Sequence, residues 1–178
     1  MKRTESQHIG LDFGTSTTLL ARSAGIDGVL IEPLTTTTRW LPSVAGVPDR
    51  SGEILVAEAT DRLPLTQIVR SVKRAITLRT ESAEVMLPDG AYSLNADAVA
   101  AAIVREALQR VNGKPEFSDL SAVRVGCPAM WDADQRDRLR RILHEAGVEV
   151  HEAEVIDEPI AVALSWVTEQ QRQHRRQF

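Results

Sequence analysis

Near the start of the chain, hydrophobic and polar residues alternate with the period of a strand. Every second residue of Ile9–Phe13 is apolar, as a strand with one buried face requires. Gly14, Thr15 and Ser16 interrupt this pattern, and the β-branched and aliphatic residues of Thr17–Ala21 restart it. The pattern predicts two antiparallel strands joined by a tight polar turn.

Short apolar runs after this hairpin predict a sheet built mainly by successive chain reversals. A turn at Gly25–Gly28 precedes the apolar run Val29–Ile31, and a further short strand is predicted at Ile54–Val56. A proline excludes Arg39–Ala45 from a helix interior, so this segment is predicted to be loop followed by extended chain. A Pro-Asp-Gly turn inside Val85–Tyr92 predicts a small hairpin.

Helical spacing of apolar residues begins in the second third of the chain. The intervals of three and four that follow Pro64 predict a helix that ends at Lys73 and Arg74, where cations complement the C-terminal end of the helix dipole. The strongest helical pattern covers Ala96–Val111, with Asn95 as the predicted cap.

The remainder of the chain alternates strands with helices. Val123–Cys127 is a predicted strand, and Asp132 and Gln135 have capping-box spacing for a helix that closes at Gly147. A strand is predicted at Val148–Val150, and a last helix opens at Pro159. Strand–helix alternation after a meandering sheet predicts an α/β fold.

Composition describes a globular protein. The chain has 178 residues, of which 43% are hydrophobic and 26% charged, and its net charge is −4. This charge provides no general basic field for nucleic acid, and no apolar run has membrane-spanning length. Residues 1–8 are polar and lack the apolar segment of a leader. With one cysteine, Cys127, and hence no internal disulfide, the chain is expected to be cytoplasmic and to bind neither nucleic acid nor membrane.

The first turn carries the candidate chemistry. Small residues at positions 14–16 can direct backbone N–H groups and two hydroxyls into one concavity that suits a phosphate. Asp12, beside this turn, would repel a bare phosphate but can hold Mg²⁺, which then bridges to a nucleotide. The residues themselves leave two interpretations open, a magnesium–nucleotide site or an ordinary hairpin with an aspartate at its rim.

Six segments, in chain order, resemble the nucleotide-binding domain of the heat-shock 70 chaperones of the DnaK type. Ile9–Ser16 resembles that family's first phosphate motif, and Ser71–Arg74 resembles the segment that bears its catalytic lysine. Cys127–Arg136 is similar to its Val-Pro-Ala-Tyr-Phe…Gln-Arg stretch, and Val155–Leu164 to its connecting motif, Asn-Glu-Pro-Thr-Ala-Ala-Ala-Leu. The two other segments, each similar to a strand near the first motif, are Leu41–Ala45 and Gly52–Ala57.

The resemblance covers residues 9–167 and implies the actin-like ATPase fold, which is ribonuclease H-like. It implies only the first of two lobes, at residues 1–168, with a mixed sheet flanked by helices and a small inserted subdomain at roughly 35–120. Residues 169–178 are almost wholly polar and include several basic side chains, so they are expected to form a tail.

For the residues around the first turn, the resemblance implies roles in holding ATP or ADP with Mg²⁺. Asp12 would hold the metal through water. Gly14, Thr15 and Ser16 would surround the β- and γ-phosphates. Lys73 would reach the γ-phosphate and neutralise the charge that develops there.

For three later residues, the resemblance implies roles in hydrolysis and its control. Glu158 would orient the attacking water, and Pro128 and Arg136 would belong to a switch that reports the nucleotide state to other domains. Each residue also has an ordinary interpretation. Lys73 suits a solvated helix end, Glu158 suits a helix N-terminus, and Arg136 belongs to a run of charged residues.

The family's second phosphate loop, Asp-Leu-Gly-Gly-Gly-Thr, and its adenosine-binding segment do not occur in this sequence. A single lobe supplies half of the donors, so the chain alone is expected to bind ATP weakly and to turn it over negligibly. The face that meets the other lobe is expected to be apolar and to require a second lobe or a partner chain.

Two other functions remain open. The hairpin and the segment around Glu158 also resemble actin-like filament proteins of the MreB type. Alternatively, the chain is a non-catalytic module that binds a protein through its open face. Sugar kinases share the hairpin, but the sequence shows no sugar-binding signature.

Overall fold

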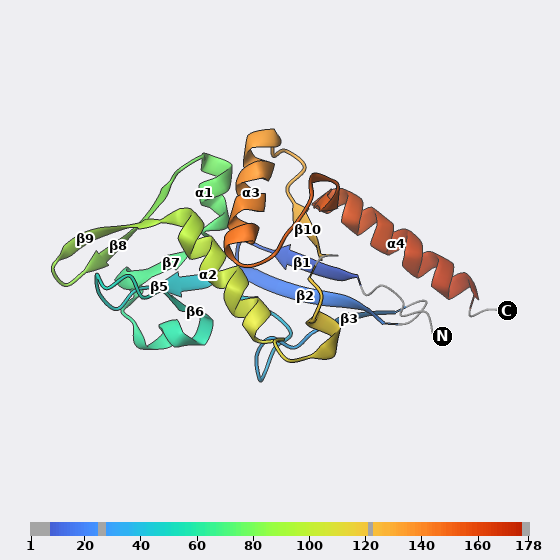
Figure 1. The fold of residues 1–178 in the computed structure, drawn as a ribbon, viewed down its shortest axis with the longest axis horizontal. Coiled ribbons are helices and arrows are strands. Elements are labelled where there is room, and N and C mark those ends of the chain that lie inside the picture. The colour runs from blue at the N-terminus through green and yellow to red at the C-terminus, as the bar shows by residue number, and fades with distance from the viewer. Residues whose placement is uncertain (1–7, 25–27, 121–122, 176–178) are drawn as a thin grey trace.

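In a computed structural model, which describes residues 8–24, 28–120 and 123–175, a mixed central sheet is flanked by helices and two smaller sheets extend from one end (Figure 1). The predicted α/β class is therefore confirmed. Within these ranges, no helix combines the length and apolarity needed to cross a membrane. The predictions for a leader and for a turn after Ala24 fall mainly on residues 1–7 and 25–27, which lie outside the described ranges.

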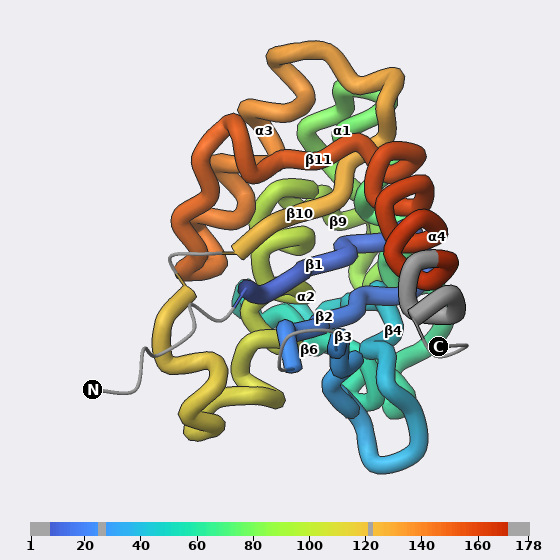
Figure 2. The backbone as a smooth tube through the Cα atoms, turned by 90° about the vertical axis from the view of Figure 1, so that its right-hand side faces the viewer, coloured from blue at the N-terminus to red at the C-terminus, as the bar shows by residue number. Residues whose placement is uncertain are grey.

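The central sheet has the strand order β11-β10-β1-β2-β3. Strand β1 is antiparallel to β2 and parallel to β10, so the predicted N-terminal hairpin is confirmed and lies at the middle of the sheet (Figure 2). The short strand β4 pairs with β2 off this path. The strands are β1 (Ile9–Phe13), β2 (Thr17–Ala24), β3 (Gly28–Ile31), β4 (Leu41–Pro42), β10 (Val123–Cys127) and β11 (Val155–Asp157).

The two smaller sheets lie at the end of the molecule away from helix α4 (Figure 1). Strand β5 pairs with both β6 and β7, and β8 forms the predicted hairpin with β9. Their bounds are β5 (Val44–Gly46), β6 (Leu55–Val56), β7 (Ile68–Arg70), β8 (Ser82–Leu87) and β9 (Gly90–Asn95). Short 3₁₀ helices occur at Ala57–Arg62, Leu65–Gln67, Pro115–Phe117 and Glu152–Glu154.

The predicted caps fix the starts of two helices. The Asn95 side chain accepts a hydrogen bond from the Ala98 N–H at 2.9 Å. Asp132 accepts from the Gln135 N–H at 3.1 Å, and the Gln135 side chain accepts from the Asp132 N–H at 3.1 Å, which completes the capping box. The four α-helices are α1 (Lys73–Leu78), α2 (Ala96–Gln109), α3 (Ala133–Glu145) and α4 (Glu158–Arg175).

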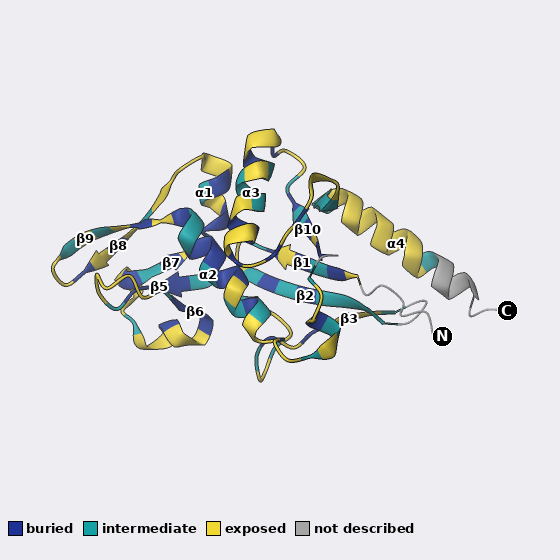
Figure 3. Cartoon of the chain, in the orientation of Figure 1, coloured by how far each residue is buried: buried dark blue, intermediate teal, exposed yellow. Residues whose placement is uncertain are grey.

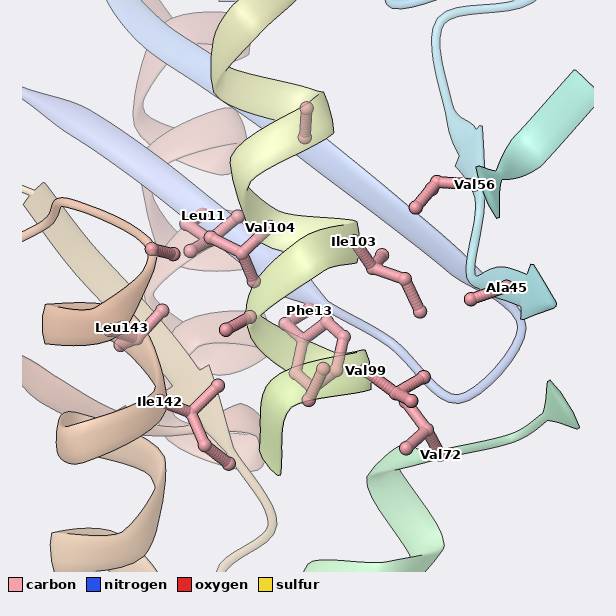
Figure 4. Close-up of a cluster of buried hydrophobic side chains, with 14 of the residues drawn as sticks. Leu11, Phe13, Ala45, Val56, Val72, Val99, Ile103, Val104, Ile142 and Leu143 are labelled. Atoms are coloured by element: carbon pink, nitrogen blue, oxygen red, sulfur yellow. The ribbon is translucent and has the colours of Figure 1, made fainter. Parts of the chain in front are cut away.

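One face of the central sheet forms the hydrophobic core with α2 and α3 (Figures 3 and 4). Phe13 is fully buried, and its ring lies near Val99 of α2 (Figure 4). Leu11 approaches Val104 of the same helix, with Leu143 of α3 beside them (Figure 4). Period-two alternation in β1 therefore places its odd-numbered side chains in the core and its even-numbered ones on the opposite face.

The helix predicted from Pro64 to Arg74 is wrong. This stretch forms a 3₁₀ turn at Leu65–Gln67 and then strand β7, which pairs with β5. Ser71 has a φ of +59°, a conformation that breaks a right-handed helix. Helix α1 begins only after this break, so Lys73 opens a helix instead of closing one.

The strand predicted at Val148–Val150 is also wrong. Val148 and Val150 are buried as a strand pattern would suggest, but β10 pairs with β11 in their place. The Val148 N–H donates to the Leu143 carbonyl, and the Val150 carbonyl accepts from Arg140. These backbone groups therefore bond to residues of α3 instead of to a neighbouring strand. Helix α4 continues past the predicted start of the polar tail to Arg175, and side chains from residue 171 onward lie outside the described ones.

A buried carboxylate ties the edge of the central sheet to the loop after α2. Glu32 is 6% exposed and accepts hydrogen bonds from Arg22 and Lys114, each at 2.7 Å. Burial alone would raise its pKa, but the bonds and charges of Lys114 and Arg22 prevail and lower the pKa.

Replacing Glu32 with glutamine is expected to lower the free energy of unfolding by about 2 kcal/mol at pH 7, because two cations lose the negative charge with which they pair. A carboxyl whose pKa is lowered by folding stabilises above its ordinary pKa and loses that effect as the pH falls through the folded value. The difference between wild type and Glu32→Gln should therefore shrink in acid. Urea unfolding from pH 7 to pH 3 measures it, with the exposed Glu84→Gln as the control.

Candidate functional site

A cavity of about 710 Å³ lies between the central sheet and helix α4. The sheet residues that alternate away from the core line it, including Gly10 and Asp12 of β1 and Gly126 of β10. A side chain at Gly10 would meet no other atom within 4 Å, so glycine there leaves the cavity floor open. Ala161 and Val162 of α4 form part of the opposite wall. Apart from Asp12 of β1 and Arg124 of β10, the sheet residues that line the cavity are apolar, and the other polar groups gather where the strands end.

The turn after β1 is narrow and depends on glycine. A Cβ atom at Gly14 would lie 2.4 Å from the Thr17 carbonyl oxygen, so no other residue fits without moving the backbone. The Gly14 N–H donates to that oxygen at 2.9 Å, which commits it to the turn. Within the described part of the chain, the N–H groups of Thr15 and Ser16 have no protein acceptor, and both residues are exposed.

Two of the three turn residues face the cavity. Gly14 and Thr15 line it, whereas the Ser16 carbonyl accepts a hydrogen bond from the Ser43 N–H at 2.8 Å and so joins the turn to the chain between β4 and β5. Of the three N–H groups expected to surround phosphates, those of Thr15 and Ser16 are available, and that of Gly14 is not.

Lys73 reaches the cavity from the first residue of α1. Its side chain is only 6% exposed, although it carries an ammonium, and its Nζ lies 2.7 Å from Oε1 of Glu158 at the start of α4. These residues are 85 positions apart in the chain. A cation at a helix N-terminus opposes the helix dipole, so the Glu158 carboxylate compensates both the burial and the position of Lys73.

Asp12 lies on the same cavity and carries the clearest electrostatic perturbation there. Partial loss of its hydration raises the pKa of the Asp12 carboxyl. The positive charge of Lys73 acts in the opposite direction, and the negative charge of Glu158 adds to the rise. Raised carboxyl pKa values in a cleft are typical of functional sites, and a cation bound there would lower this one.

The remaining two predicted residues, Pro128 and Arg136, differ in their relation to the cavity. Pro128 lines the cavity. Arg136 does not line it, but forms an ion pair with Asp157, the residue before Glu158, and donates to the Trp131 carbonyl at 3.1 Å. Asp157 also lies 3.8 Å from the Sγ of Cys127. Burial raises the pKa of that thiol, so Cys127 has the character of a small buried side chain and not of a nucleophile.

Sequence reasoning missed the contact of Trp131 with the site. Trp131 is buried, at 3% exposed, and its ring centroid lies 5.5 Å from the Lys73 Nζ. One signal in the sequence could have indicated this contact. Trp131 lies three residues after Pro128, inside the segment Cys127–Arg136 that resembles a motif of the heat-shock 70 family. The orientation of α1 that places the Lys73 ammonium near the Trp131 ring could not be predicted from the sequence.

The site offers exposed N–H groups, the ammonium of Lys73, the guanidinium of Arg124 and two carboxylates around a single cavity. Among the described residues, no cluster of three or more His, Cys, Asp or Glu side chains could hold a metal by itself. Mg²⁺ commonly uses one or two carboxylates and completes its shell with water and substrate phosphates, so Asp12 fits that use. A scan against models of known protein families found no match for this chain, and a search of curated proteins found none.

Proposed function

We propose that the chain is the first lobe of an actin-like nucleotide-binding domain of the heat-shock 70 type, and that its cavity holds the phosphates of Mg-ATP or Mg-ADP. The observation that carries the proposal is convergence. Asp12, Lys73 and Glu158 come from three distant parts of the sequence and line one cavity with the Gly14 turn. A hairpin with an incidental aspartate gives no reason for that meeting.

The backbone N–H group of Thr15, the Lys73 ammonium and the Glu158 carboxylate have different proposed roles. The N–H group of Thr15, which lines the cavity and has no protein acceptor among the described residues, donates to a phosphate oxygen, as backbone concavities do. Lys73 brings a compact positive charge to the terminal phosphate. An arriving phosphate competes with Glu158 for this ammonium. Once released, the Glu158 carboxylate can accept a hydrogen bond from a water near the terminal phosphate and orient it.

Mg²⁺ fits beside Asp12, where it would bridge to the phosphates and neutralise their charge. Asp12 would hold it through water, and the partly desolvated carboxylate would gain from a nearby cation. Apart from Asp12 and Arg124 the sheet side of the cavity is apolar, and the described residues supply phosphate ligands without an evident site for adenosine. Binding to this chain is therefore expected to be weak, and hydrolysis negligible.

Helix α4 supports the need for a second lobe or a partner chain. Large apolar side chains along it are exposed, and Val162 and Trp166 are 69% and 65% accessible. A surface of this kind is typical of an interface. The same observation also suits the two alternatives. A protein-binding module would bind its partner independently of Asp12 and Lys73, whereas an MreB-type filament would pellet in sedimentation with ATP.

Calorimetric titration with nucleotide tests the proposal. We expect magnesium-dependent binding of ATP and ADP with dissociation constants on the order of 0.1–1 mM, and no binding of adenosine, because the phosphates provide the contacts. Lys73→Met should weaken ATP binding about 10-fold, and Asp12→Asn should remove the dependence on magnesium.

Matched controls separate the site from general charge effects. Arg74→Met removes the exposed cation next to Lys73, and Asp61→Asn removes an exposed carboxylate far along the chain from Asp12. Neither residue lines the cavity, so both variants should bind as wild type does. Absence of nucleotide binding, or binding that neither Lys73→Met nor Asp12→Asn alters, would contradict the proposal.

A further inference from the structure

The surroundings of the Lys73 ammonium contain one aromatic ring that the proposed phosphate chemistry leaves unexplained. The Trp131 ring centroid is 5.5 Å from Nζ, within the range of a cation–π contact. Tryptophan is the strongest aromatic partner for such a contact, and the contact gains strength where water is excluded, as it is around this lysine. A ring placed there restricts where the ammonium can lie.

The Trp131 ring is itself held in place. Its indole N–H donates to the Thr77 hydroxyl at 3.1 Å, and its backbone N–H donates to the Pro128 carbonyl at 3.0 Å. Thr77 lies four residues after Lys73, hence on the same side of α1. The indole therefore spans the lysine-bearing face of this helix, with one end anchored by a hydrogen bond and the ring near the ammonium.

Trp131 also connects to the partner of the lysine. Its carbonyl accepts a hydrogen bond from Arg136, whose guanidinium pairs with Asp157, the neighbour of Glu158. The contacts thus form a closed circuit from Lys73 through Trp131 and Arg136 to the Glu158 segment and back through the ion pair.

From this circuit we propose that Trp131 is a positioning residue for Lys73, which keeps the ammonium at the cavity wall where it can meet the terminal phosphate of a nucleoside triphosphate. The inference rests on the proposed function. A ring that only filled space would affect all nucleotides equally. A ring that positions the ammonium affects ATP more than ADP, because only ATP carries the phosphate that Lys73 is assigned to reach.

The test is the ratio of the ADP to the ATP dissociation constants, measured by calorimetry with each nucleotide as its magnesium complex. Trp131→Leu should reduce this preference for ATP about 3- to 10-fold, toward the value for Lys73→Met. Trp131→Phe retains an aromatic ring and should keep most of the preference for ATP. Thr77→Val removes the anchor of the indole with little change in volume and should reduce the preference in the same direction, by less.

Two comparisons give the test its power. In the Lys73→Met background, Trp131→Leu should cause no further loss of preference, because the ammonium that it positions is gone. Trp166→Leu, which alters an exposed tryptophan, should leave the preference unchanged. Circular dichroism establishes that each variant is folded, and Thr77→Val and Trp131→Phe carry the test if Trp131→Leu does not fold.

The outcomes separate this inference from the proposed function. If wild type prefers ATP and Trp131→Leu or Thr77→Val keeps that preference in full, the role of Trp131 is wrong and the nucleotide site stands. A further loss in the Lys73→Met background, or equal weakening of both nucleotides, would equally overturn the role of Trp131. If wild type binds neither nucleotide, the proposed function fails and the role of Trp131 fails with it.

Discussion

Replacing Phe13 with alanine is expected to lower the free energy of unfolding by about 4 kcal/mol. The ring is completely buried and lies where the central sheet meets α2 (Figure 4). Its removal leaves a cavity that neighbouring β-branched side chains such as Val99 cannot fill, because their rotamers are fixed by the helix. Urea unfolding followed by circular dichroism measures the change.

The same substitution is expected to loosen the candidate site, because Phe13 directly precedes the Gly14 turn. Phe13→Leu should cost less, about 1–2 kcal/mol, since it retains most of the apolar volume. Met130→Ala is the surface control, because that side chain is 81% exposed, and it should change stability by less than about 0.5 kcal/mol. A cost below about 1 kcal/mol for Phe13→Ala would mean that the core is not packed around this ring.

The ion pair at the cavity should respond asymmetrically to loss of its two members. Glu158→Gln is expected to destabilise the chain by about 2–3 kcal/mol, because it leaves the buried Lys73 ammonium with a neutral amide oxygen and no compensating negative charge. Lys73→Met should cost less, because the Glu158 side chain is 43% exposed and water can replace the lysine. Urea unfolding of both variants at pH 7 tests the asymmetry.

The double variant isolates the coupling between the two residues. Because the charge that suffers from the loss of Glu158 is absent in Lys73→Met, adding Glu158→Gln to it should cost little, with a coupling of at least about 1 kcal/mol between the two sites. Strict additivity, with a Glu158→Gln effect below about 0.5 kcal/mol, would show that the ammonium does not depend on this carboxylate in solution.

The sequence was a good guide wherever the local pattern and the tertiary structure agree. Period-two alternation located β1 and β10, and cap residues located the starts of α2 and α3. In the strands the residues that favour the local conformation also face the core, and the caps bond within their own helices, so nothing outside the segment had to be known. The same pattern also predicted that Asp12 and the Gly14 turn belong to one β-hairpin.

The segment around Lys73 could not be predicted from its pattern. Apolar residues between positions 65 and 72 fit helical spacing, yet pairing with β5 and the left-handed conformation of Ser71 decide the structure. Val148 and Val150 likewise show alternation without a strand, because β11 occupies the place beside β10. The meeting of Lys73 with Trp131 depends on how α1 packs near α3, which no local signal contains.

Paramagnetic broadening asks directly whether one nucleotide phosphate site lies at the Gly14 turn. Backbone amide signals are recorded while ADP or ATP is added with Mn²⁺ in place of Mg²⁺, and Mn²⁺ without nucleotide serves as the control. We expect nucleotide-dependent loss of the signals of Asp12, Gly14, Thr15 and Gly126, while the β8–β9 hairpin is unaffected. Broadening that spares the Gly14 turn, or that is the same without nucleotide, would rule out a nucleotide phosphate site there.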